Sequence, residues 1–339
     1  MKTITKLLLI AFLFSAAQLS FGQGCEEPAG DDDAAKLFGF FQPEFDYRMT
    51  DPGHSTFKFK RARIGFTGNI PYDFSYYVVM ENSKFVSGTG HPYLLDAFIS
   101  YKRFDWAKVS MGSFKQPFGQ EVNTSCSGLH TIFRASVSDQ LVAPQRDMGI
   151  MVTGGNKETF LKYAVAIMNG RGLLIEDNNM KKDFIARLTL KPLDFLRIGG
   201  SYRLGYPVKN EDRRFSFAGE MQIELADLLF QAEYIYDEGD YYPAAGGGCG
   251  VDPVPLGRKR DGYYAQVLYM TPWNLQPVVK FEAFDYDKNA KNTEETIITT
   301  GINYWFNDWT RIQVNYRYRA EKGAEVMNDD ILVQLQVKF

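Results

Sequence analysis

Near its C-terminus the chain reads Arg311-Ile-Gln-Val-Asn-Tyr-Arg-Tyr-Arg319, in which charged or amide side chains alternate strictly with apolar or aromatic ones. A period of two is typical of a β-strand, because successive side chains of a strand point to opposite faces. If the apolar set faces lipid, the arginines face water. The opposite orientation would cost about 2–4 kcal/mol for each arginine near the midplane of a bilayer.

The last segment of the chain has the same two-faced pattern. Apolar residues at 331, 333, 335, 337 and 339 alternate with Gln334, Gln336 and Lys338. Such runs are roughly 9–12 residues long, the length that a tilted membrane strand needs, whereas soluble sandwiches use strands of about 5–6 residues. An open sheet edge in lipid would leave backbone groups unsatisfied, so the strands must close into a barrel. The terminal Phe339 resembles the signal by which outer-membrane barrels are recognised for assembly.

Sixteen such segments follow one another and predict an all-β, transmembrane antiparallel β-barrel. The expected strands lie near 36–48, 55–69, 72–82, 92–103, 105–115, 146–155, 158–169, 181–191, 194–205, 212–225, 227–238, 260–270, 275–287, 294–306, 308–320 and 329–339. Seven short connections alternate with eight long ones, as in an even-stranded bacterial barrel with both termini on the periplasmic side.

The N-terminus predicts export. Lys2 and Lys6 precede an apolar run from Leu7 to Phe14, and Ser20-Phe-Gly22 offers small residues for cleavage before Gln23. We therefore expect a signal peptide over 1–22, a short segment over 23–35 and the barrel over 36–339, located in the bacterial outer membrane. The chain has no apolar run long enough for a transmembrane helix beyond this signal, which excludes a polytopic helical protein.

A barrel of sixteen strands is too wide for side chains to fill, so a water-filled channel is expected. The third long connection, 116–145, is the longest between two expected strands, and its middle is polar and rich in serine. We expect it to fold inward and narrow the lumen. The alternative is an exposed extracellular loop.

Three stretches resemble the phosphate-selective porin O and P family. They are Gly112-Ser-Phe-Lys-Gln-Pro-Phe-Gly-Gln-Glu121, Leu141-Val-Ala-Pro-Gln-Arg-Asp-Met-Gly149 and Lys60-Arg-Ala-Arg-Ile-Gly-Phe-Thr-Gly68. They resemble the G-x-F-K-x-P-F-G-x-E, L-x-P-x-R-D-x-G and R-R-A-R-x-G-x-x-G elements of that family. The resemblance implies a homotrimeric outer-membrane channel that passes small anions such as phosphate.

Basic residues fall into two candidate groups for contact with anions. One is a wall formed by neighbouring strands near both ends of the chain: Arg61, Arg63, Arg311, Arg317 and Arg319, where a bulge near Lys60 is needed to turn Arg61 and Arg63 inward. The other brackets the inward loop and consists of Lys115, Arg134 and Arg146. Arginine suits an anion path because its planar fork binds phosphate oxygens and stays charged. The alternative is that the loop charges pair with Glu121, Asp139 and Asp147 and brace the loop.

Other functions find less support. The formal net charge of −3 gives no global field for nucleic acid. No metal-ligand spacing, cofactor motif or catalytic motif is present, and Asp51 near His54 is the single lead toward an enzyme. The chief alternative is a plugged or non-selective barrel that serves as a structural anchor or docking platform. If a disulfide forms, Cys126 and Cys249 are the expected pair, since Cys25 lies across the membrane from both; otherwise all three remain thiols.

Overall fold

A computed structural model describes residues 34–173, 175–207, 213–241, 255–322 and 326–339. The expected signal peptide, Cys25 and Cys249 lie outside the described residues. No helix in these ranges is long and apolar enough to cross a membrane.

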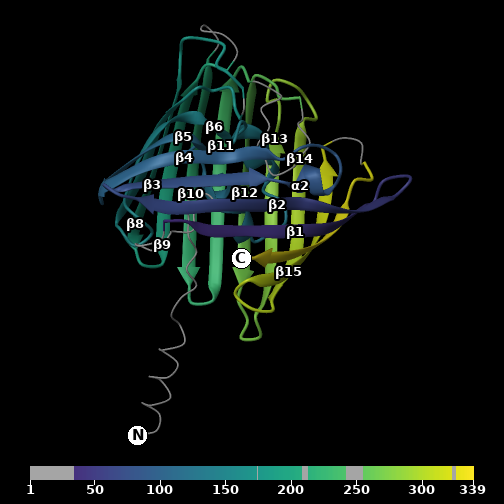
Figure 1. The fold of residues 1–339 in the computed structure, drawn as a ribbon. Coiled ribbons are helices and arrows are strands. Elements are labelled where there is room, and N and C mark those ends of the chain that lie inside the picture. The colour runs from purple at the N-terminus through teal and green to yellow at the C-terminus, as the bar shows by residue number, and fades with distance from the viewer. Residues whose placement is uncertain (1–33, 174, 208–212, 242–254, 323–325) are drawn as a thin grey trace, which may run out of the picture.

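The described chain is built from long strands that connect at their ends (Figure 1). The strands are β1 (Lys36–Arg48), β2 (His54–Ile70), β3 (Phe74–Glu81), β4 (Tyr93–Phe104), β5 (Ala107–Lys115), β6 (Arg146–Gly154), β7 (Leu161–Met168), β8 (Asp183–Leu193), β9 (Leu196–Gly205), β10 (Arg214–Leu225), β11 (Leu228–Gly239), β12 (Lys259–Tyr269), β13 (Leu275–Asp285), β14 (Glu294–Trp305), β15 (Thr310–Glu321) and β16 (Asp330–Lys338). Short helices are α2 (Ser83–Val86), α3 (Gln120–Asn123) and α4 (Ser136–Leu141), with a 3₁₀ turn at Cys126–Gly128.

Each strand pairs with its neighbours in sequence, and β1 pairs with β16, so the sheet is a closed barrel. All pairs are antiparallel, which confirms the predicted architecture. The strand ends differ from the prediction by up to three residues. For example, β7 begins at Leu161 and not near 158, because the Asn156 side chain accepts hydrogen bonds from the backbone of Glu158 and Thr159 and holds a turn there.

The predicted bulge in β2 is present. Gln42 of β1 pairs with Arg61, whereas Pro43 pairs with Phe59, which leaves Lys60 as an extra residue in β2. Pro43 has no N–H to donate to the ladder, and bulges accommodate such positions. The extra residue resets the alternation, so that the side chains of Arg61 and Arg63 face the lumen and are buried.

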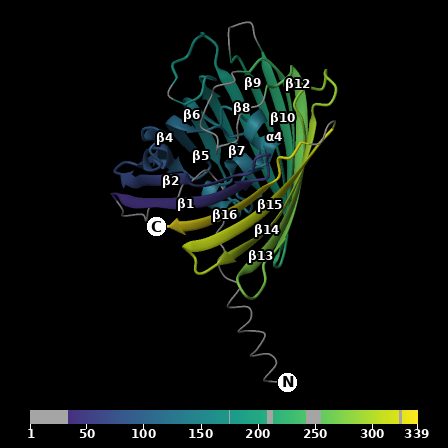
Figure 2. The ribbon, with the colours of Figure 1, turned by 90° about the vertical axis from the view of Figure 1, so that its right-hand side faces the viewer.

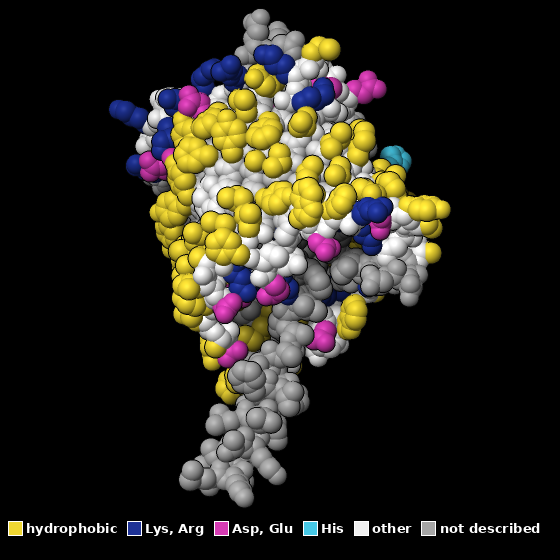
Figure 3. Space-filling model, turned by 90° about the vertical axis from the view of Figure 1, so that its left-hand side faces the viewer, with side chains coloured by type: hydrophobic (Ala, Val, Ile, Leu, Met, Phe, Trp, Pro, Cys, Tyr) yellow, Lys and Arg dark blue, Asp and Glu magenta, His cyan; other side chains and the backbone are white. Residues whose placement is uncertain are grey.

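The outer face of the barrel is apolar. On β15 Val314, Tyr316 and Tyr318 are exposed, while Asn315 and Arg317 between them are buried toward the lumen. Figure 3 shows hydrophobic side chains over the middle of one outer face, with charged side chains above and below. This is the surface that a bilayer covers, and it leaves the polar faces of the strands to line the interior.

Candidate functional site

The long connection between β5 and β6 lies inside the barrel. Most of residues 116–145 are buried, including every residue of α3 and α4. Figure 2 shows α4 within the ring of strands. The loop therefore occupies the lumen and does not lie over its rim, and its contacts with the wall decide where solutes pass.

Two wall carboxylates hold the short helices of the loop. Glu233 of β11 accepts hydrogen bonds from the backbone N–H groups of Gln120 and Glu121 at 3.0 and 3.1 Å. Glu282 of β13 accepts one from Ser136 at 2.8 Å. These N–H groups lie at the N-terminal ends of α3 and α4. The first N–H groups of a helix have no partner within the helix and attract negative charge. The inward acids of the wall thus serve as anchors for the loop.

Amide side chains of the last strands bind the middle of the loop. Asn315 Oδ1 accepts from the backbone N–H of Ile132 at 2.8 Å, and Asn303 Nδ2 donates to the carbonyl of His130 at 2.8 Å. Gln336 Nε2 donates to the carbonyl of Ser127 at 3.2 Å. Burial lowers the pKa of His130 to about 4.

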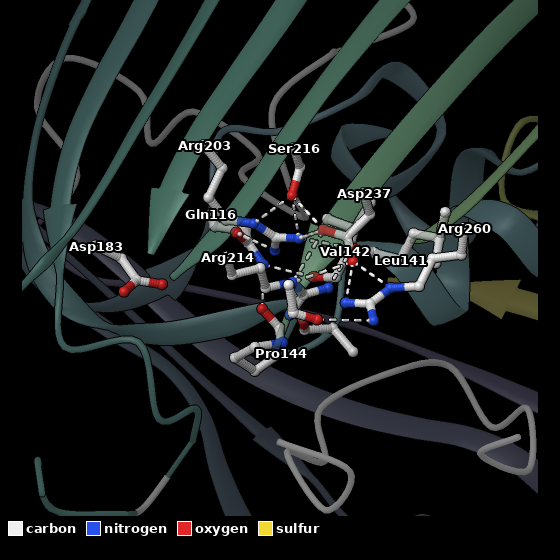
Figure 4. Close-up of polar contacts among 12 residues, drawn as sticks. Gln116, Leu141, Val142, Pro144, Asp183, Arg203, Arg214, Ser216, Asp237 and Arg260 are labelled. Carbon is white, nitrogen blue, oxygen red and sulfur yellow. Dashed lines mark hydrogen bonds and ion pairs between the residues drawn. The ribbon is translucent and has the colours of Figure 1, made fainter. Parts of the chain in front are cut away.

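The returning limb of the loop is held by an arginine cluster, which consists of Arg203, Arg214, Arg260 and Asp237 (Figure 4). Asp237 Oδ1 lies 3.0 Å from Arg203 Nη2 and 3.0 Å from Arg214 Nε, and Arg260 pairs with the other carboxylate oxygen. Arg203 and Arg214 also donate to the carbonyl of Leu141 at 2.8 and 2.7 Å. Three guanidinium groups therefore share one carboxylate, and two of them also donate hydrogen bonds to the backbone of the loop.

The arginines of the predicted basic wall face the lumen, and four of them, Arg61, Arg63, Arg311 and Arg317, are buried. The expectation that Arg311 and Arg317 stay hydrated is wrong, because their exposed fractions are 3% and 4%. The Arg317 guanidinium lies 4.4 Å from the centroid of the Phe133 ring in the loop. Arg61 binds Gln42 at 2.7 Å and Arg63 binds Glu81 at 2.8 Å. Arg319 is half-buried and pairs with Glu295, and the role of this wall in anion binding stays a prediction.

The basic residues that bracket the loop contact protein groups. Lys115 Nζ donates to the carbonyls of Val122 and Thr124 at 2.8 and 3.1 Å. Arg134 Nε donates to the carbonyl of Glu121 at 2.9 Å, and Arg146 Nε pairs with Asp96 at 2.8 Å. These contacts hold the loop through backbone carbonyls and Asp96, and the pairing of these basic residues with the carboxylates of Glu121, Asp139 and Asp147 stays a prediction. Burial raises the pKa of Glu121, whose carboxylate accepts from the backbone of Ala135.

A pocket that is partly open to solvent, with about 740 Å³ of space free of protein atoms, remains between the loop and the wall formed by β3–β8. The basic side chains that line it are Lys108, Lys115, Lys162 and Arg187, and Asp96 is the one acidic residue in the lining. Of the four basic residues, sequence analysis singled out only Lys115. Lys108, Lys162 and Arg187 each lie between two apolar residues of a strand. The alternation of the sequence could therefore have predicted that their side chains face the lumen. The sequence pattern contains no signal that the loop leaves this side of the lumen open.

A larger cavity, about 2600 Å³ and open to solvent, extends from the loop to the short turns. Its charges are mixed and largely paired. Arg187 binds Glu220 at 2.6 Å, Arg197 binds Glu224 at 2.9 Å and Lys191 binds Glu158 at 3.3 Å. Arg187 lines both cavities and its charge is offset by Glu220, so the excess of positive charge in the smaller cavity comes from Lys108, Lys115 and Lys162.

A closed barrel of sixteen strands with an apolar outer face, a polar interior and a loop inside the lumen defines an outer-membrane porin. The chain belongs to the phosphate-selective porin O and P family, because the sequence model of that family matches residues 39–226, more than half of the chain. Family and fold together place the protein in the outer membrane. None of the curated protein sequences matches this chain.

Solved porin structures are similar in fold at low sequence identity. OmpF of Salmonella typhi, in a complex with daunomycin, has a TM-score of 0.73 at 13% identity, over 93% of this chain and 100% of that one. An anion-selective porin from Comamonas acidovorans has a TM-score of 0.69 at 11% identity, over 91% and 100%. The outer membrane channel DcaP of Acinetobacter baumannii has a TM-score of 0.64 at 14% identity, over 94% and 100%.

Proposed function

We propose that this porin lets small anions, phosphate among them, diffuse passively across the outer membrane. The observation that carries the proposal is the cavity beside the loop, with four basic side chains and one acidic one in its lining. Asp96 is paired with Arg146 at 2.8 Å and Arg187 with Glu220 at 2.6 Å, so Lys108, Lys115 and Lys162 carry the excess of positive charge in this lining. The family match and the similarity in fold to the anion-selective porin from Comamonas acidovorans also support passage of anions.

The local charges of this cavity outweigh the formal net charge of −3. At physiological ionic strength, charges in water are screened beyond about 8 Å, so an ion responds mainly to the side chains beside its path. A ring or row of cationic side chains at a narrow point admits anions and retards cations. The acidic residues outside this path therefore do not make the channel selective for cations.

Neutralising two of the lining lysines should reduce anion selectivity. In the variant Lys108→Gln/Lys162→Gln we expect the anion-to-cation permeability ratio, from the reversal potential in a KCl gradient across a planar bilayer, to fall by roughly twofold or more. Lys338→Gln is the matched control, since Lys338 lines only the larger cavity. An unchanged ratio in the double variant would contradict the proposal. No conductance in the unaltered protein would favour an anchor or docking platform.

We infer two further properties. The protein assembles as a homotrimer, in keeping with its family and with the solved trimer form of OmpT from Vibrio cholerae, which it resembles in fold with a TM-score of 0.65. It serves as a channel and not as an enzyme. Asp51 and His54, the one lead toward catalysis, are both exposed at the outer end of β2.

A further inference from the structure

The ring of Phe133, in the loop between β5 and β6, contacts two cations of the barrel wall. Nζ of Lys60 on β2 lies 3.3 Å from the centroid of the ring, and Cζ of Arg317 on β15 lies 4.4 Å from it. The carbonyl of Phe133 accepts a hydrogen bond from Nζ of Lys280 on β13 at 2.9 Å. One residue of the loop is therefore held by three basic side chains, which come from three strands of the wall.

The bulge in β2 brings Lys60 to the ring. In a regular strand, the side chains of Lys60 and Arg61 would point to opposite faces. Lys60 is the extra residue of the bulge opposite Pro43, and a bulge re-aims the side chains next to it. Both side chains therefore reach into the lumen: Arg61 binds Gln42 of β1, and Lys60 lies over the ring in the loop.

A phenylalanine ring suits this position because it combines an apolar body with an attraction for cations. Phe133 is buried and packs in one cluster with Ile132 and with Leu332 of β16. The face of an aromatic ring attracts ammonium and guanidinium groups, and the attraction is larger where water is excluded. An aliphatic side chain of similar size would keep the apolar packing and lose the attraction.

We propose that Phe133, Lys60 and Arg317 form a clamp that holds the middle of the loop away from the cavity beside it, with Phe133 as a positioning residue for permeation. The strands that hold Phe133 are β2, β13 and β15, whereas the cavity is bordered by β3–β8. A loop held to the first set of strands leaves the second set uncovered. The inference concerns how the loop is held and not which ion passes, so it goes beyond the proposed function.

The first test changes the electrons of the ring and keeps its shape. Fluorine draws electron density from the face of a ring, so phenylalanines with one, two or three ring fluorines at position 133 weaken the attraction for cations in steps. We expect the fraction of time that single channels in planar bilayers spend in brief closures to rise with each fluorine. The expected rise is about fivefold for three fluorines. Closures that do not depend on the fluorines would overturn the inference, because packing alone does not respond to them.

The second test follows the loop without any current. Cys126 lies in the same loop and is buried. In a Cys25→Ser/Cys249→Ser background, labelling by a maleimide reports how often the loop opens, because a buried thiol reacts only when it becomes exposed. Phe133→Leu should raise the labelling rate about fivefold. Phe160→Leu is the control and should leave the rate unchanged, since it removes an exposed ring from the turn before β7.

A double-mutant cycle assigns the effect to the contact between Lys60 and the ring. Lys60→Met should raise the labelling rate of Cys126 in the unaltered loop, and should raise it by a smaller factor in Phe133→Leu, where the contact is already lost. Equal factors in the two backgrounds would contradict the clamp. If Phe133→Leu does not fold, the variant with three fluorines takes its place in the cycle.

The outcomes separate the clamp from the proposed function. A labelling rate in Phe133→Leu equal to that of the unaltered protein would overturn the clamp, and anion selectivity would stand. A channel that prefers cations, or a barrel without conductance, would overturn the proposed function, and a faster labelling of Phe133→Leu would still support the clamp.

Discussion

Replacement of residues 117–144 by Asn-Gly should raise the single-channel conductance severalfold and reduce the ion selectivity. The backbone N–H of Gln116 donates to the carbonyl of Gln145 at 3.0 Å, so a two-residue turn can join β5 and β6 at that point. The strand ladder stays intact, and the lumen loses the loop that narrows it. A barrel of sixteen strands without this loop is a wide aqueous pore.

The matched control shortens another long connection. Tyr286 N donates to the carbonyl of Thr293 at 3.2 Å, so residues 287–292 between β13 and β14 can also be replaced by Asn-Gly. This variant should conduct like the unaltered protein, because the shortened segment does not enter the lumen cavities. If both variants conducted like the unaltered channel, residues 116–145 would not lie in the permeation path.

Asp237→Asn should lower the free energy of unfolding by about 3–5 kcal/mol, because it leaves Arg203, Arg214 and Arg260 buried without their shared carboxylate. Asn keeps the size of the side chain, so the change tests charge and not packing. Urea titration of the protein in lipid vesicles, followed by tryptophan fluorescence, measures the difference.

Asp261→Asn on β12 is the matched control for Asp237→Asn, because it removes one carboxylate charge outside the arginine cluster. Asp261 pairs with Lys288 at 2.8 Å in a partly exposed position, and loss of such a pair costs about 1 kcal/mol or less. The account of the arginine cluster would fail if the two variants unfolded at the same urea concentration.

The strands and their orientation are predictable from the sequence, because alternation is a local property. The run from Arg311 to Arg319 alone fixes which side chains of β15 face the lumen, and Pro43 opposite the bulge explains how Arg61 turns inward. Sixteen strands and their closure follow from repeating this argument along the chain.

The path inside the lumen is not predictable in this way. It depends on contacts between residues far apart in sequence, such as Glu233 with the backbone of Gln120, 113 positions away. Inward acids such as Glu233 are equally consistent with a cation path until those contacts are known. For the same reason Arg311 is correctly placed toward the lumen by the sequence, but its burial is visible only in the structure.

The central claim, that the loop leaves open a channel with an excess of positive charge, is tested most directly by the zero-current potential of the unaltered protein. The protein is inserted into a planar bilayer between 1 M and 0.1 M KCl, and the potential is measured after the conductance has been recorded. We predict discrete conductance steps and a negative potential on the dilute side, because chloride crosses faster than potassium. The absence of steps, or a positive potential on the dilute side, would contradict the claim.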